Sequence, residues 1–246
     1  MNDTSATRTG LRLPSVDEHD RDRVLHRILS VADDLPRISV QVSRSEAARA
    51  MEEHGSDDEP FTHWETLHLI ISIVETLFDD EVTSYSPTFH AQLTLMLQFP
   101  LVPESTATQV AFGRGMGENA LLLIERIAAA AYARGITVDE RVEELAARGD
   151  VGHDLSSRCL RGEIRRVPNG GRMQKAVELF RLTAAYAPEQ LRPPVLCVIA
   201  WLLWAAGKRA LALAYLREAL AIEPGHLLAQ SFSILMSRSR PDWTHE

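Results

Sequence analysis

Residues 171–188 read GRMQKAVELFRLTAAYAP and residues 207–224 read GKRALALAYLREALAIEP, two stretches that align without a gap. The identical positions are Gly171/Gly207, Ala176/Ala212, Arg181/Arg217, Ala185/Ala221 and Pro188/Pro224. A repeat of this length is typical of stacked helical hairpins, in which each unit buries its apolar face against the next. The repeat predicts a helical C-terminal third and indicates no chemistry by itself.

The segment between the two copies is apolar on every face, and it predicts a helix over 194–206. A helix without a polar stripe is usually buried on both sides, so we expect a central core helix packed between helices at 172–186 and 208–222. The alternative is that its Trp201 and Trp204 face forms a groove for a partner, because tryptophan is enriched at binding hot spots.

Residues 194–227 also fit part of the tetratricopeptide pattern, with Ala200 as the small residue of a first helix. The second-helix positions are Ala212, Leu216, Ala219 and Pro224. Only about one and a half units can be read, and an independent solenoid needs roughly three. We therefore expect a tetratricopeptide-like antiparallel helical hairpin inside a larger globule.

Helix start signals recur along the rest of the chain. Four capping boxes are present, Ser15 with Glu18, Ser43 with Glu46, Thr62 with Glu65 and Thr137 with Glu140, and Ser86 precedes Pro87. The apolar periodicity between them predicts helices near 16–34, 44–54, 63–79, 87–98, 105–112, 117–134, 138–148, 154–161, 172–186, 194–206, 208–222 and 226–238. The strand-like piece 38–42 has nothing to pair with. The predicted fold is all-α, an irregular multi-helix globule that ends in the hairpin.

A polar break at 55–61 (GSDDEPF) divides the chain into two predicted parts. Residues 1–60 are expected to form a loosely attached N-terminal helical arm, with a disordered start over 1–14. Residues 61–246 are expected to form an all-helical domain, in which 171–238 is the tetratricopeptide-like C-terminal part.

The C-terminal third resembles the end of the actinobacterial domain-of-unknown-function family 4192. The resemblance rests on Arg192-Pro193-Pro194, Ala200-Trp201-Leu202, Gly207, the segment from Arg217 to His226, Leu228-Ala229 and Pro241-Asp242-Trp243. Residues 63–150 resemble the family's middle helical region. Members of that family typically begin with a strand-rich α/β region, which this chain lacks, so it resembles the helical half alone or a divergent short member. The resemblance implies an architecture and no catalytic residue.

Composition and charge restrict the classes of protein that fit. The 246 residues carry a formal net charge of −8, which disfavours non-specific binding to nucleic acid or anionic lipid. Cys159 and Cys197 are the only cysteines and lack metal-ligand spacing. The N-terminus has no apolar signal region, and the longest apolar run, 195–206, is shorter than the ~20 residues that span a bilayer. We expect a cytoplasmic protein without membrane association.

Motifs of catalysis or cofactor binding are sparse in the sequence. Gly113, Gly115 and Gly117 follow no predicted strand and lack a GK[ST] ending, so a helix junction is expected there rather than a phosphate loop. His63 and His68 lie on different faces of one predicted helix, unlike a zinc-binding pair. The acidic residues of 52–59 predict a solvated turn. The sequence therefore predicts no cofactor, metal or catalytic residue and leans against an enzyme.

The segment 158–175 reverses the charge of this acidic chain, with six basic residues and Glu163 as its one acid. If 154–166 is helical, Arg158, Arg161 and Arg165 share a face that could contact phosphates or an acidic partner. The alternative is that these arginines pair with carboxylates elsewhere on the chain.

We expect a non-catalytic helical interaction or scaffold protein whose partner is another protein. With Arg192, the arginines would give the C-terminal helices a positive rim suited to an acidic peptide or a carboxylate terminus. The alternative function is a nucleic-acid-associated regulatory factor that uses 158–175, and an enzyme with an unrecognised site is a third. The candidate partner-binding residues are Arg158, Arg161, Arg165, Arg192, Trp201 and Trp204.

Overall fold

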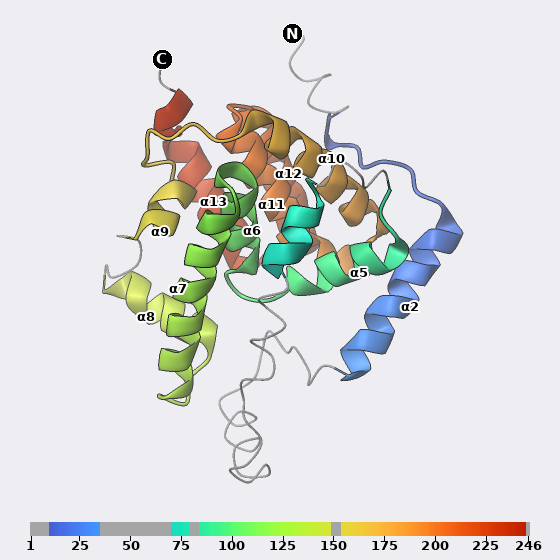
Figure 1. The fold of residues 1–246 in the computed structure, drawn as a ribbon, viewed down its shortest axis with the longest axis horizontal. Helices are drawn as coiled ribbons and strands as arrows, with labels where there is room; N and C mark the ends of the chain where they lie inside the picture. The colour runs from blue at the N-terminus through green and yellow to red at the C-terminus, as the bar shows by residue number, and fades with distance from the viewer. Residues whose placement is uncertain (1–9, 35–69, 79–83, 149–153, 245–246) are drawn as a thin grey trace.

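The computed structural model describes residues 10–34, 70–78, 84–148 and 154–244. In these ranges all regular secondary structure is helical, which confirms the all-α prediction (Figure 1). The α-helices are α2 Glu18–Asp34, α5 Pro87–Met96, α6 Val102–Phe112, α7 Arg114–Tyr132, α8 Val138–Ala147, α9 Leu155–Leu160, α10 Gly170–Tyr186, α11 Arg192–Ala205, α12 Arg209–Ile222 and α13 Leu227–Arg238, with 3-10 turns η1 Glu189–Leu191 and η2 Asp242–Thr244. Residues 70–76 are also helical.

Two of the predicted caps start helices as expected. Thr137 accepts from the backbone N–H of Glu140 at 3.1 Å, while the Glu140 carboxylate accepts from the backbone N–H of Thr137 at 2.9 Å. Ser86 accepts from the N–H of Phe89 at 3.2 Å. The reciprocal pair at Thr137 and the single bond at Ser86 satisfy donors that a helix N-terminus leaves unpaired.

The cap of α2 differs from the prediction. Asp17, rather than Ser15, accepts from two backbone N–H groups of the first turn, at 2.9 and 3.2 Å. Aspartate suits this place because its charge also interacts favourably with the positive end of the helix dipole. The boxes at Ser43 and Thr62, and the strand-like piece 38–42, lie outside the described residues.

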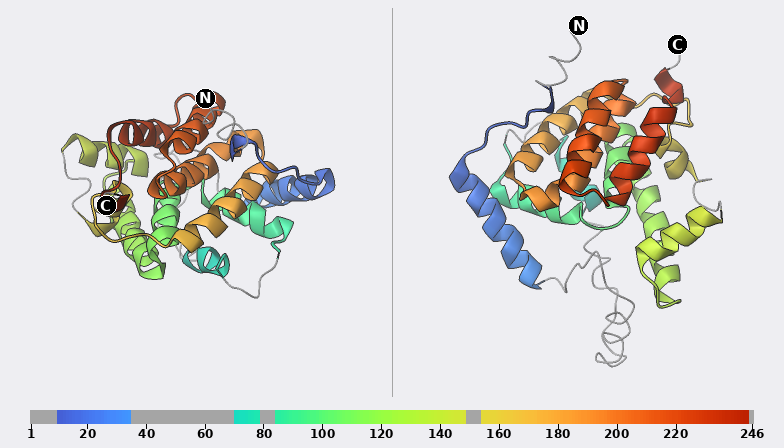
Figure 2. Two further views of the ribbon diagram at one scale, coloured as in Figure 1. Left: turned by 90° about the horizontal axis from the view of Figure 1, so that it is seen from above. Right: turned by 180° about the vertical axis from the view of Figure 1, so that it is seen from behind.

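Helix α11 forms the centre of the molecule and packs against α10, α12, α6 and α13 (Figures 1 and 2). Every residue from Pro193 to Ala205 is buried. This confirms the interpretation of 194–206 as a core helix. The neighbours α11 and α12 are joined by the short turn 206–208 and make the most extensive contact of the fold, so they form a helical hairpin; its tetratricopeptide character stays a prediction.

Helix α2 is packed against α5 and α10 rather than loosely attached. Val24 and Ile28 of α2 are buried with Ala91 and Leu95 of α5, and α2 also contacts α10. Within the start expected to be disordered, Gly10 binds Tyr215 of α12 and Arg12 binds Arg181 of α10, while residues 1–9 lie outside the described residues. The predicted boundary near residue 60 lies outside the described residues and stays a prediction.

The glycine-rich stretch is a helix junction, as expected. Gly113 has φ +96° and is at once the end of α6 and the start of α7. Gly117 lies inside α7, where a Cβ would come within 2.5 Å of the Gln109 Oε1 atom. In the described part of the chain no helix is long and apolar enough to cross a membrane.

Candidate functional site

The N-terminal segment 10–17 crosses the surface of the C-terminal helices before α2 begins (Figures 1 and 2). Tyr215 of α12 donates from its hydroxyl to the carbonyl of Gly10 at 2.8 Å. Arg181 of α10 donates from Nη2 to the carbonyl of Arg12 at 2.5 Å. Both donors bind main-chain oxygens, so these two bonds do not depend on the side chains of the segment.

The side chains of residues 11–14 alternate between contact and solvent. Leu11 and Leu13 are half-buried against the main core, while Arg12 and Pro14 are exposed. Gly10 lies against Leu211, whose Cδ2 would be 3.1 Å from a Cβ at this position. The segment is therefore held as a bound peptide would be, by apolar side chains and by bonds to its backbone.

An open cleft of about 360 Å³ lies beside the segment. Its helical wall is formed by Leu196, Tyr215 and Ile222, with Arg192 and Glu218 as the charged groups. Leu11, Arg12 and Leu13 close the other side. We call the surface of Arg181, Arg192, Leu196, Tyr215, Glu218 and Ile222 the α10–α12 groove.

A second cleft of about 450 Å³ lies further along the segment, where Val16 leads into α2. Its walls include Tyr186, Pro188 and Glu189 from the end of α10 and η1, with Arg21 from α2. Residues 11–13 thus line one cleft and Val16 lines the other.

Burial sets the protonation of the groove. It raises the pKa of Tyr215, against the opposing effect of the Arg181 charge, so the phenol keeps its proton and acts as a donor. Burial and the charge of Arg21 lower the pKa of Arg192, whose Nε donates to the carbonyl of Ala187 at 3.0 Å. Arg192 stays a cation at neutral pH, because the ordinary pKa of an arginine lies far above 7.

The indoles of Trp201 and Trp204 cannot form a partner groove. They are 0% and 1% exposed. Trp201 Nε1 donates to the Leu160 carbonyl at 2.8 Å, and Trp204 Nε1 donates to the Ser239 carbonyl at 3.4 Å. The partner-groove interpretation of this face was wrong, because α9 and the chain after α13 cover it.

The arginine segment is not one helical face, which corrects the second expectation. Helix α9 ends at Leu160, and Gly162 turns the chain with φ +75°. Arg161 instead pairs with Glu163 through two bonds, at 2.8 and 2.6 Å. Arg158 donates to the Glu163 carbonyl at 3.2 Å, while Arg165 is exposed.

Two other basic residues of the segment 158–175 bind groups on other helical stretches of the fold. Arg172 forms a two-pronged ion pair with Glu75. Arg166 donates to the Phe112 carbonyl at 3.1 Å and lies over its ring. The alternative, pairing with carboxylates elsewhere on the chain, is confirmed for Arg172, whereas Arg161 pairs with Glu163 inside the segment.

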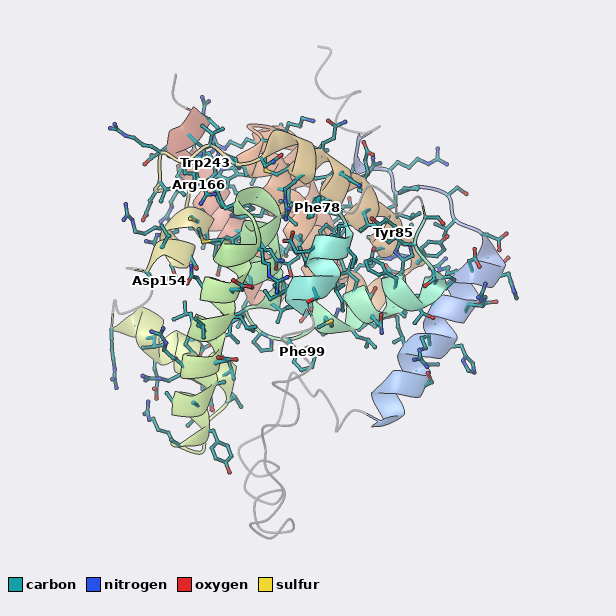
Figure 3. The ribbon with its side chains drawn as sticks, viewed as in Figure 1. Phe78, Tyr85, Phe99, Asp154, Arg166 and Trp243 are labelled. Atoms are coloured by element: carbon teal, nitrogen blue, oxygen red, sulfur yellow. The ribbon has the colours of Figure 1, made fainter. Side chains whose placement is uncertain are left out.

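The structure separates Arg192 from the arginine segment. Arg192 is the first residue of α11. Trp201, which lies nine residues further along the same helix, donates to the carbonyl of Leu160 in α9. At 1.5 Å per residue this is about 13 Å of helix. Figure 3 shows Arg166 beside Trp243 at one end and Tyr85, near α2, at the other. A continuous positive rim does not form.

One thiol and one imidazole that the sequence analysis did not pair lie together. Cys197 Sγ is 3.9 Å from Nδ1 of His226. The same Nδ1 accepts from the N–H of Ala229 and caps α13, and burial raises the pKa of Cys197 well above its usual value. A buried, protonated thiol is a poor nucleophile, so the contact is structural. Among the described residues, no three His, Cys, Asp or Glu side chains gather as metal ligands.

A family model described as "Domain of unknown function (DUF4192)" matches residues 13–238. The match begins at Leu13 in the docked segment and ends at Arg238, the last residue of α13. It therefore covers the N-terminal and middle helices as well as the C-terminal third on which the resemblance rested. No curated protein and no solved structure matches the chain.

Proposed function

The chain belongs to the family described as domain of unknown function DUF4192, and from that premise we propose that it is a non-catalytic helical interaction protein. Its site is the α10–α12 groove, and its partner is a segment of another protein. The observation that carries the proposal is the way in which Tyr215 and Arg181 hold the backbone of residues 10–12. A surface that binds one peptide segment through its carbonyl oxygens has the chemistry to bind another.

The charges of the groove revise the expected partner. Arg192 and Glu218 line the same cleft, and the arginines of 158–165 lie elsewhere. An acidic peptide or a carboxylate terminus would therefore rely on Arg192 and on Arg181, which already donates to the carbonyl of Arg12. The presence of both signs of charge, with Glu218 beside the arginines, favours orientation and register over a general preference for acidic ligands.

We do not propose the nucleic-acid alternative, because two of its six basic residues are neutralised within the chain. Arg161 pairs with Glu163 and Arg172 pairs with Glu75. Binding of nucleic acid depends on cations that are free to replace counterions at phosphates. With a net charge of −8 the remaining cations face a repulsive background.

Site-specific photo-crosslinking in the native host cell tests the proposal. A photoreactive amino acid is placed at Glu218 in the groove, and the matched control carries it at Arg126, an exposed residue of α7. We expect a discrete peptide of another protein to cross-link at position 218 and not at position 126. Equal recovery from both positions, or from neither, would contradict the proposal.

A third variant tests whether the partner binds at the arginine segment instead. The Glu218 cross-linker is combined with Arg165→Glu, a charge reversal at an exposed side chain. Cross-linking should be unchanged, because Arg165 lies away from the groove. Loss of the product would move the partner's site to the arginine segment.

A further inference from the structure

We propose that residues 10–13, Gly-Leu-Arg-Leu, are a built-in occupant of the α10–α12 groove, and that the partner binds by displacing them with a segment of the same Leu-x-Leu spacing. This inference rests on the proposed function and names the chemistry of its partner. The occupant is argued from four features of the segment and the groove.

The contacts that hold the segment are few. The segment contributes two half-buried leucines, and its backbone accepts one bond from Tyr215 and one from Arg181. Ordering the chain before α2 costs conformational entropy, which opposes these contacts. Because these effects oppose one another, the segment is held less firmly than the buried core, and a competitor can displace it.

The groove has binding capacity that the segment leaves unused. Nε of Arg181 is buried and has no hydrogen-bond partner among the described residues. A buried donor without an acceptor is unfavourable, so a ligand that supplies one gains affinity. The cleft of about 360 Å³ beside residues 11–13 gives room for a bulkier occupant, and the cleft of about 450 Å³ at Val16 gives room for one that continues towards α2.

The segment can leave without opening the fold. Helix α2 is anchored to α5 by its own cluster, in which Val24 is 0% and Ile28 is 4% exposed. Residues 14–17, between the segment and α2, form no helical turn, so they can act as the hinge. Displacement therefore exposes the groove and leaves the buried core intact.

The spacing of the apolar side chains indicates which partner segments fit the groove. Leu11 and Leu13 contact the core while Arg12 between them faces solvent. A partner segment therefore needs two apolar side chains two residues apart, with little restriction on the residue between. Tyr215 and Arg181 place no further demand, because they bind carbonyl oxygens that every residue has.

Fluorescence anisotropy with purified full-length chains tests the proposal. The probe is a labelled peptide of residues 8–16, RTGLRLPSV, and the protein is either wild type or the double variant Leu11→Ser, Leu13→Ser. We expect the double variant to bind the peptide at least tenfold more tightly, since its own segment no longer competes. Equal affinities, or no binding to either chain, would overturn the proposal.

Two controls identify the binding surface. A peptide with serine at both leucine positions should bind neither chain. Adding Tyr215→Phe to the double variant should weaken binding of the leucine peptide several-fold, because one carbonyl bond is lost while the ring remains. Tight binding of the serine peptide, or no effect of Tyr215→Phe, would place binding elsewhere and overturn the proposal.

Sedimentation velocity of the wild type separates a second copy from a partner. If the N-terminal segment of a neighbouring molecule fills the groove, the chain will dimerise and the double variant will not, which overturns displacement by a partner. A monomeric wild type supports the proposal.

The outcomes also separate this inference from the proposed function. Peptide binding by the double variant without any cross-linked protein at Glu218 would reject the function alone. A cross-linked partner whose segment binds both chains equally would reject only the displacement.

Discussion

Arg172 of α10 holds Glu75, 97 residues earlier in the chain, through two hydrogen bonds, from Nη1 to Oε2 at 3.1 Å and from Nη2 to Oε1 at 2.9 Å. Its guanidinium carbon lies 3.7 Å from the centroid of the Phe78 ring, and its Nε donates to the Val110 carbonyl at 3.2 Å. Gln109 donates to Glu75 as well, at 2.9 Å. One arginine thus joins the helical stretch 70–76, α6 and α10.

Substitution Arg172→Met should destabilise the protein. Although burial raises the pKa of Glu75, the hydrogen bonds from Arg172 and Gln109 lower it below its ordinary value, so the carboxylate depends on these partners. We expect the free energy of unfolding at neutral pH to fall by about 1.5–3 kcal/mol, the range for hydrogen bonds to charged groups. Urea denaturation measures it. The control Arg23→Met breaks an exposed pair with Asp20 and should change stability by less than about 1 kcal/mol.

The effect of Arg172→Met should depend on pH in a defined direction. A carboxylate whose pKa is lowered in the folded state stabilises the protein above its unfolded value of 4.5, and this contribution is lost as pH falls through the folded pKa. The difference between wild type and variant should therefore shrink in acid. A difference that stays constant down to low pH would show that the ion pair is not its source.

Gly162→Ala should be much more disruptive than Gly135→Ala. Both glycines have positive φ, +75° and +63°, so alanine strains the backbone at both by about 1–2 kcal/mol. At Gly162 the added Cβ would also lie 2.8 Å from Pro241 Cα and 2.8 Å from Trp204 Cη2, whereas Gly135 has open space. Such overpacking adds about 1–3 kcal/mol. Equal melting temperatures for the two variants would contradict this packing.

Trp201→Ala should lower the free energy of unfolding by about 3–5 kcal/mol, as large-to-small changes of buried aromatic residues do. Leu202→Ala, also in the buried run of α11, should lower it by about 2–5 kcal/mol. Leu227→Ala is the matched surface control, since its side chain is 54% exposed on α13. Thermal unfolding compares the three, and an unchanged Trp201→Ala melting temperature would refute the core position.

His90 should make the protein less stable in mild acid. It is 1% exposed, with Nδ1 2.9 Å from Thr183 Oγ1, and burial lowers its pKa to about 4. The unfolded chain binds this proton near its ordinary pKa of 6.5, before the folded state does. Stability should therefore fall as pH decreases from 6.5 towards 4, by roughly 3 kcal/mol at 1.36 kcal/mol per pKa unit.

Urea denaturation of wild type and His90→Leu between pH 4 and pH 7 checks this slope. His226, whose pKa burial also lowers, contributes to it in the same direction and is present in both chains. The variant should lose the part that His90 supplies. An identical slope in both chains would assign the acid sensitivity to other groups.

Both thiols should be unreactive in the folded protein. Burial raises the pKa of Cys159 to about 11 and that of Cys197 well above its usual value. Because the thiolate is the nucleophile, a disulfide reagent at pH 8 should modify neither cysteine until denaturant is added. Rapid modification of either one in the native state would contradict its burial.

The helices could be predicted because their signals are local. The expected 194–206 and 208–222 correspond to α11, Arg192–Ala205, and α12, Arg209–Ile222. Apolar periodicity, caps and turn glycines act within a few residues, so the sequence carries them directly. The differences arise at helix starts, where α6 begins at Val102 rather than near 105 and α7 begins at Arg114 immediately after Gly113.

The candidate site could be predicted only in part. Arg192 lines the groove as one of its charged groups. In contrast, Arg161 is paired with Glu163, and the indoles of Trp201 and Trp204 are buried. The residues that hold the segment, Arg181 and Tyr215, stand in the two copies of the repeat, where periodicity assigns them only to helices. No local pattern indicates that Tyr215 binds Gly10, 205 residues away.

The sequence by itself determined that this protein is a set of amphipathic and apolar helices with α11 at its centre, because helix propensity, capping and hydrophobic periodicity depend on near neighbours. Only the tertiary structure decided which side chains became accessible and which carbonyl oxygens they bind. Those properties depend on how helices far apart in the chain pack, since burial covers the tryptophans, opposite charges neutralise arginines, and the N-terminal segment binds where Tyr215 and Arg181 converge.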